Sequence, residues 1–136
     1  MGISWYGLDT QLHTVDHDPV DLDRAYEIVD RYLGQLRPHY ESGEEALAAT
    51  TFGFRRPDGS YMQICVHAPD SIDVEHDFSL IKSPLLRLIG GRRQADEHLT
   101  SRDELRSRTR QFFTLSRVAF RQALRTDPSI RRAGAI

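Results

Sequence analysis

An alternation of apolar and polar residues in the middle of the chain constrains the fold most strongly, because side chains on a β-strand point alternately to opposite faces. The segments 52–56 and 61–67 flank an Asp-Gly pair, which supplies the backbone angles of a tight hairpin turn. A third segment, 72–78, alternates in the same way. The pattern predicts three antiparallel strands in a meander. The residues expected on the buried face of the second and third strands are Met62, Ile64, Val66, Ile72, Val74, His76 and Phe78.

Residue spacing near the N-terminus predicts one strand and one helix. Residues 3–8 are expected to form a short strand, and the polar segment 9–18 is expected to be a loop. A helix should begin near Pro19 or Asp21, since proline suits the first helical position and aspartate is a good N-cap. Its apolar residues recur at intervals of three and four until a proline ends it after residue 37.

Two further helices are expected in the second half of the chain. The first covers 84–89, between a Ser-Pro start and a Gly-Gly stop. The second begins at Ser101, where Glu104 completes a capping box, and continues to about Thr126. Residues 129–136 are expected to form a frayed tail.

The order of these elements predicts an α+β fold. The chain has 136 residues, the usual size of one domain with a sizeable core, and this domain is expected to span residues 1–128. We expect a small antiparallel sheet of three to four strands, with the N-terminal helix, the short helix and the long C-terminal helix packed on one face. No apolar run approaches the roughly 20 residues of a membrane-spanning helix, so no membrane partner is expected. A single cysteine, Cys65, favours a reducing cytoplasm.

The charges are distributed unevenly along the chain. The formal net charge is only −2, but residues 1–78 hold 15 acidic and five basic residues, whereas residues 79–136 hold five acidic and 13 basic residues. Such asymmetry indicates either a charged partner or two halves that pack against each other. Both readings stay open at the level of sequence.

An acidic surface that attracts a protein partner is the functional prediction we favour. Acidic residues raise the association rate of a basic partner when they share one face; on a protein without a partner they form an ordinary solvated surface. The function expected is that of a small non-catalytic protein-binding module of the inhibitor, toxin-immunity or chaperone type, without a cofactor. The candidate partner-binding residues are Asp16, Asp18, Asp21, Asp73, Glu75 and Asp77.

A basic ridge on the last helix is the basis of one alternative. Arginine side chains that lie on one flank of a continuous helix can bind an anion, a nucleic acid or an acidic protein. A nucleic-acid partner is not expected, because the pI is about 6.3 and nucleic-acid-binding domains usually have a pI above about 9. The ridge residues are Arg106, Arg110, Arg117, Arg121 and Arg125.

A metal-dependent hydrolase is the alternative from the enzyme class. Its site would combine His13, His17, His67 and Asp16, but the sequence has neither a His-Glu-x-x-His motif nor paired cysteines. It also lacks the serine-nucleophile, phosphate-loop and dinucleotide motifs. Cys65 lies between Ile64 and Val66 on a predicted strand, which favours a packed residue over a nucleophile. No motif therefore names a chemistry, and we expect no catalysis and no bound metal.

Overall fold

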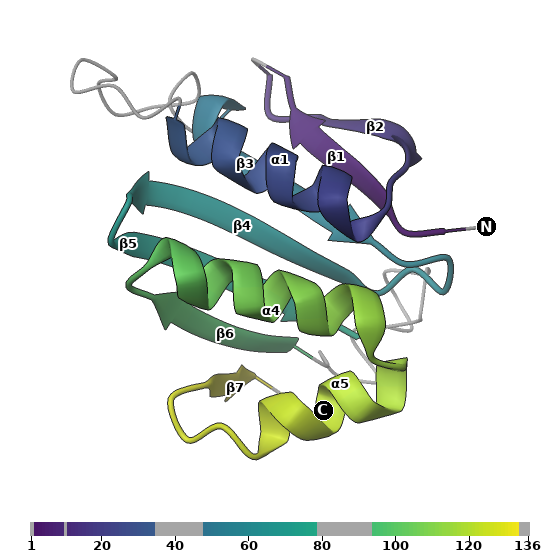
Figure 1. Ribbon diagram of the computed structural model, residues 1–136, viewed down its shortest axis with the longest axis vertical. Coiled ribbons are helices and arrows are strands. Elements are labelled where there is room, and N and C mark those ends of the chain that lie inside the picture. The colour runs from purple at the N-terminus through teal and green to yellow at the C-terminus, as the bar shows by residue number, and fades with distance from the viewer. Residues whose placement is uncertain (1, 10, 35–47, 79–93, 134–136) are drawn as a thin grey trace.

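The computed structural model describes residues 2–9, 11–34, 48–78 and 94–133 (Figure 1). Its strands are β1 (Ser4–Leu8), β2 (Thr14–Pro19), β3 (Thr51–Arg55), β4 (Tyr61–Ala68), β5 (Ser71–Asp77), β6 (Gln94–Leu99) and β7 (Arg131–Ala133). The helices considered below are α1 (Leu22–Gly34), α4 (Arg102–Thr114) and α5 (Arg117–Arg125).

All of these strands join one antiparallel sheet in the order β2-β1-β3-β4-β5-β6-β7. The predicted hairpin is confirmed as β3 and β4, and Gly59 in its turn has a φ of 92°, which favours glycine. The predicted third strand is confirmed as β5, and the strand predicted over 3–8 is β1.

The predicted number of three to four strands was too low, because the sheet has seven within the described residues. Residues 9–18 were expected to be a loop, but Thr14–Pro19 forms β2, whose residues are all exposed and therefore show no apolar alternation. Strand β6 carries Glu97 at an inward position, which hides its alternation. The sequence predicts a frayed tail after residue 128, whereas residues 131–133 form β7 and pair with β6.

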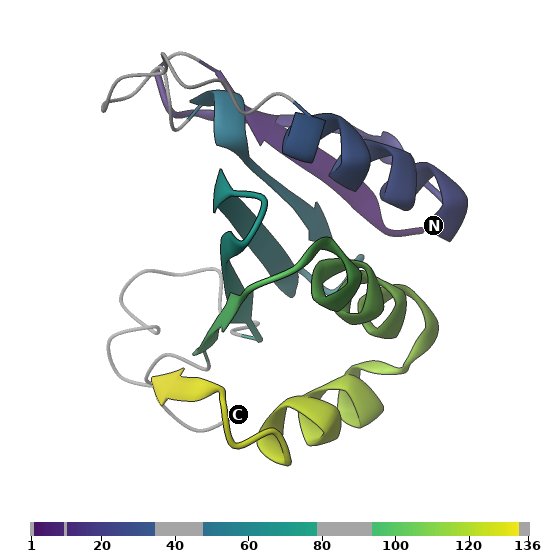
Figure 2. The ribbon, with the colours of Figure 1, turned by 60° about the vertical axis from the view of Figure 1, so that its left-hand side comes forward.

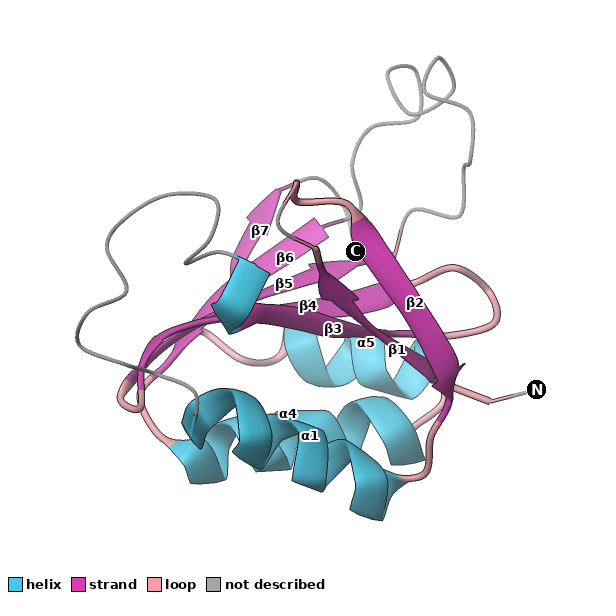
Figure 3. Ribbon diagram, turned by 90° about the horizontal axis from the view of Figure 1, so that it is seen from above, coloured by secondary structure: helices cyan, strands magenta, loops and turns pink. Residues whose placement is uncertain are grey.

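The helices α1, α4 and α5 cover one face of the sheet, as expected (Figures 2 and 3). The periodicity of α1 places Ala25, Ile28, Val29 and Tyr32 in the core, and its N-cap is Asp21, whose carboxylate accepts from the backbone of Arg24 at 2.8 Å. The expected extension of this helix to residue 37 and the short helix over 84–89 lie outside the described residues. The buried side chains of α4 and α5 include Leu105, Phe112, Phe120 and Leu124.

The long C-terminal helix predicted over 101–126 is two helices. Ser101 caps α4 as predicted, with its hydroxyl accepting from Glu104 N at 3.1 Å. However, α4 ends at Thr114, and Ser116 then caps α5 by accepting from Ala119 N at 3.1 Å. The Arg56 guanidinium donates to two carbonyls at this junction, which satisfies acceptors that a continuous helix would have bonded internally.

The face of the sheet opposite the helices is called the outer face below. The Tyr6 ring covers this face at strand β3. Tyr6 of β1 is 2% exposed and lies over Gly53 of β3, where an added Cβ would come within 2.4 Å of the ring. None of the helices within the described residues has the length and hydropathy that a membrane crossing requires.

Candidate functional site

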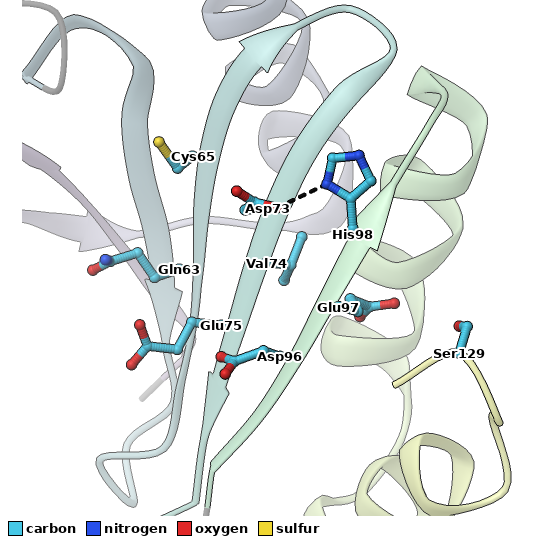
Figure 4. Close-up of a pocket in the computed structure, with 9 residues that line it drawn as sticks. All are labelled: Gln63, Cys65, Asp73, Val74, Glu75, Asp96, Glu97, His98 and Ser129. Atoms are coloured by element: carbon cyan, nitrogen blue, oxygen red, sulfur yellow. Dashed lines mark hydrogen bonds and ion pairs between the residues drawn. The ribbon is translucent and has the colours of Figure 1, made fainter. Parts of the chain in front are cut away.

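Strands β4, β5 and β6 line a hollow of about 450 Å³ on the outer face (Figure 4). The antiparallel register aligns outward side chains in rows across these strands: Cys65, Asp73 and His98 form one row, and Gln63, Glu75 and Asp96 form the next. The six side chains are fixed by strands in the middle of the sheet, so their spacing follows from the backbone. The wall of the hollow therefore combines apolar surface with the carboxylates of Asp73, Glu75 and Asp96.

Asp73 is held at the centre of the first row by two histidines. One carboxylate oxygen lies 2.8 Å from His98 Nδ1, and the other lies 2.8 Å from His67 Nε2. These hydrogen bonds, with that of His98 making the larger contribution, hold the pKa of Asp73 below its usual range. All three side chains remain about half exposed, so the cluster is open to a ligand.

Tyrosines supply the neutral partners of the second row. Tyr61 Oη donates to Glu75 Oε1 at 3.2 Å, and Tyr6 Oη donates to Gln63 Oε1 at 3.1 Å. Burial, followed by the negative charges of Glu75 and Asp77, raises the pKa of Tyr61. The phenol therefore stays protonated and acts as a hydrogen-bond donor.

The six predicted partner-binding residues fall into two groups. Asp73, Glu75 and Asp77 alternate along β5 and point to the outer face, although Asp77 is buried. The remaining three lie at the other end of the sheet. Asp16 on β2 accepts from Arg55 at 2.9 Å, Asp18 is exposed on the same strand, and Asp21 caps α1. The β5 residues therefore lie apart from the other three, and of the six only Asp73 and Glu75 line the hollow.

The predicted basic ridge is interrupted by the break between α4 and α5. Arg106 lies 4.1 Å above the Tyr26 ring and contacts Asp30, which also accepts two hydrogen bonds from Arg102. The other ridge arginines lie on both sides of the break. Arg110 and Arg125 are exposed, Arg117 donates to the Phe78 carbonyl, and Arg121 lies 5.7 Å from the Phe78 ring. The pairing of Asp30 with α4 shows that part of the charge asymmetry is satisfied internally.

The four residues of the alternative metal site do not come together. His13 lies beside Asp9 near the β1–β2 turn, His17 stacks on Trp5 with ring centroids 3.9 Å apart, and His67 contacts Asp73. In the part of the chain that the structure describes, no group of three or more His, Cys, Asp or Glu side chains has a geometry that suits a metal ion.

The row of Cys65, Asp73 and His98 does not form a nucleophilic triad. An activated thiol needs its base beside it, with the carboxylate behind the base. Here Asp73 stands on the strand between Cys65 and His98, and the Cys65 sulfur accepts from Thr51 Oγ1 at 3.5 Å. The order of the groups is therefore wrong for proton transfer from the thiol.

A second histidine–carboxylate cluster lies on the helix side of the same strands. The His76 ring bonds Glu97 through Nε2, while Arg108 of α4 lies 2.9 Å from Glu97 and 2.9 Å from Asp127. Burial lowers the pKa of His76 in spite of the nearby carboxylate, so its imidazole is neutral. Sequence reasoning missed Glu97 and Arg108; an acid at the middle of an otherwise alternating segment was the available signal.

No protein-family model, curated protein or solved structure matches this chain. A fold class by itself does not define a function, because function depends on the site that the fold carries. The side chains of the outer face are therefore the basis of the functional proposal.

Proposed function

We propose that this chain is a small non-catalytic protein-binding module of the cytoplasm, of the inhibitor, toxin-immunity or chaperone type, which binds a basic segment of its partner on the outer face of β4–β6. The observation that carries the proposal is the hollow of about 450 Å³ with Asp73, Glu75 and Asp96 in its wall. Strands β5 and β6 thus place three carboxylates on one surface that a partner could contact.

The chemistry of this wall suits guanidinium and ammonium groups. A carboxylate accepts two parallel hydrogen bonds from an arginine, and such charge-assisted bonds are stronger than neutral ones. Because central strands of a sheet hold the acids, little ordering of the site is needed on binding. Gln63 and the Tyr61 hydroxyl add neutral polar groups beside the charges, which favours a peptide over a simple cation.

Binding is favoured over catalysis by the arrangement of the reactive groups. Within the described residues, the thiol of Cys65 has no imidazole as its hydrogen-bond partner, and the two nearby histidines, His67 and His98, contact the Asp73 carboxylate instead. The single cysteine is free, which agrees with the reducing compartment proposed here.

The test compares three tagged baits in lysate from the natural host at low salt. The first bait is the unaltered chain, and the second carries Glu75→Gln and Asp96→Asn, which remove two charges from the hollow. The third carries Asp23→Asn and Glu27→Gln, a matched loss of two charges on the exposed side of α1. Captured proteins are quantified by mass spectrometry, and the affinity of each is then measured with purified protein.

We expect a basic partner that the first and third baits retain and that the second bait loses by at least tenfold in affinity. The dependence of its association rate on salt should also be weaker for the second bait, because electrostatic steering is reduced. Equal affinities for the second and third baits would contradict the proposal. A stable partner that binds all three baits with the same affinity would contradict it as well.

A further inference from the structure

A second hollow, of about 390 Å³, lies on the helix side of the sheet at the junction of α4 and α5. Its wall is largely apolar and includes Ile3, Phe112, Phe113 and Leu115. Two arginines, Arg56 and Arg117, also line it. An apolar hollow with two guanidinium groups differs in charge from the acidic outer face and calls for a different ligand.

Arg56 is fixed in the wall of this hollow. Its side chain is buried, and its guanidinium lies 4.4 Å from the ring centroid of Phe112 and 5.2 Å from that of Phe120. Nη2 donates to the Phe112 carbonyl at 2.7 Å and to the Leu115 carbonyl at 3.3 Å. These bonds explain how Arg56 ends α4, but Nη1 is buried and has no hydrogen-bond partner among the described residues.

Arg117 has an unused donor beside the same hollow. Its Nη2 donates to the Phe78 carbonyl at 2.6 Å, whereas Nε has no hydrogen-bond partner within the described part of the chain. The nearest carboxylate is that of Asp58, which also lines the hollow and lies 3.9 Å from Nε, beyond hydrogen-bond distance.

The charges of these three groups do not cancel. Asp58 is already engaged through Oδ1 by the backbone and hydroxyl of Ser60, at 2.8 and 2.6 Å. Two guanidinium groups face one carboxylate, which leaves one positive charge, and each guanidinium has a buried N–H without an acceptor. Buried polar groups are normally hydrogen-bonded, so two orphaned donors on one hollow indicate a missing acceptor.

We propose that this hollow binds a carboxylate that carries an adjoining apolar group. Because both nitrogens are buried, the Arg56 and Arg117 side chains would have to turn toward the hollow for the carboxylate to accept from Arg117 Nε and Arg56 Nη1. The apolar group would pack on Phe113 and Leu115. A free aromatic acid and a peptide C-terminus that ends in an apolar residue share this chemistry, and the site is distinct from the outer face.

The test uses N-acetyl-phenylalanine as the probe and N-acetyl-phenylalaninamide as its uncharged match. Two-dimensional ¹H–¹⁵N spectra of the full chain report the Nε–Hε resonance of Arg117 directly. We expect the acid to shift this resonance in a saturable manner and to bind at least tenfold more tightly than the amide. Acetate, which lacks the apolar group, should bind at least tenfold more weakly than the acid.

Arg117→Gln is the variant to examine, because Arg56→Gln removes bonds that end α4 and can unfold the chain. Arg117→Gln should lower the affinity for the acid at least tenfold and leave the affinity for the amide unchanged. Leu115→Ser should lower the affinity for both probes. Arg110→Gln, an exposed arginine of α4 that does not line the hollow, is the control and should bind the acid as the unaltered chain does.

Two outcomes would overturn the proposal: equal affinity for the acid and the amide, or an equal loss in Arg117→Gln and Arg110→Gln. A pentapeptide that ends in phenylalanine identifies the source of the ligand. If it binds more tightly than N-acetyl-phenylalanine and its C-terminal amide does not bind, the site reads a peptide C-terminus. If N-acetyl-phenylalanine binds more tightly, the ligand is a free acid.

Discussion

The two faces of β5 and β6 carry histidine–carboxylate clusters of the same chemistry in opposite environments. On the helix side, the side chains of His76, Glu97 and Arg108 are 0%, 1% and 11% exposed. On the outer face, the central acid Asp73 is 58% exposed, and its two histidines are 51% exposed. The same contact between an imidazole and a carboxylate is therefore part of the core on one face and part of the surface on the other.

Solvent decides what each cluster can do. Burial raises the pKa of Glu97, but the His76 hydrogen bond and the positive charge of Arg108 outweigh it and leave this pKa below its usual range. An ionised carboxylate is thus held in the core, where it cannot exchange its partners for water. Around Asp73, water can replace either histidine, so a ligand can do the same at little cost.

This difference in solvent exposure predicts that the buried cluster of His76, Glu97 and Arg108 is essential for stability. Arg108→Ala removes the cation that neutralises Glu97, and breaking a buried ion pair by removing one partner costs roughly 3–5 kcal/mol. We expect the free energy of unfolding, measured by urea denaturation, to fall by about this amount. The exposed Arg110→Ala on the same helix should change it by less than about 0.5 kcal/mol. Equal losses in the two variants would contradict the assignment.

The pH dependence of stability should carry the signature of His76. Its folded-state pKa is lowered by burial, so below the unfolded value of about 6.5 the unfolded chain binds a proton that the folded chain does not. The contribution to stability is complete above about pH 6.5. It falls by about 1.4 kcal/mol per pH unit as the pH drops from there toward the folded-state pKa.

His76→Phe removes this contribution and leaves the other five histidines unchanged. Urea denaturation at pH 7.5, 6.5 and 5.5 should give a slope between 6.5 and 5.5 that is shallower in the variant than in the unaltered chain. Identical slopes would show that His76 takes up its proton in the folded state as readily as in the unfolded one.

The sequence predicts those elements whose residue pattern is set by one buried face or by neighbours within one helical turn. The alternation of Met62, Ile64 and Val66 follows from one buried face, and it identified the hairpin. The Ser101 cap depends only on neighbours within one turn, and it was also found. Strand β2 was missed because neither of its faces is covered, so no periodicity marks it.

The clusters themselves depend on partners that are distant in sequence. Glu97 occupies a core position only because His76 and Arg108 reach it from another strand and from α4. An acid stands where the alternation of residues 94–99 requires an apolar residue, so no strand was predicted there, and Asp96 and His98 of the candidate site were missed with it. The end of α4 likewise depends on Arg56, which lies 59 positions before Leu115. Half of the predicted acidic set was found together because β5 alone fixes it.

The smallest stability effect is expected at the centre of the outer cluster. Asp73→Asn removes the carboxylate that contacts two exposed histidines, and even exposed ion pairs contribute only about 0–1 kcal/mol, so the free energy of unfolding at pH 7 should fall by no more than that. The folded-state pKa of Asp73 is lowered, so its contribution is complete above the unfolded value of about 3.9 and is lost as the pH falls through the folded value. The two proteins should therefore become equally stable in strong acid.

Asp70→Asn, an exposed acid in the β4–β5 turn, is the control. A loss above about 2 kcal/mol in Asp73→Asn would show that this cluster supports the fold as the buried one does, and would leave it less able to exchange its histidines for a partner.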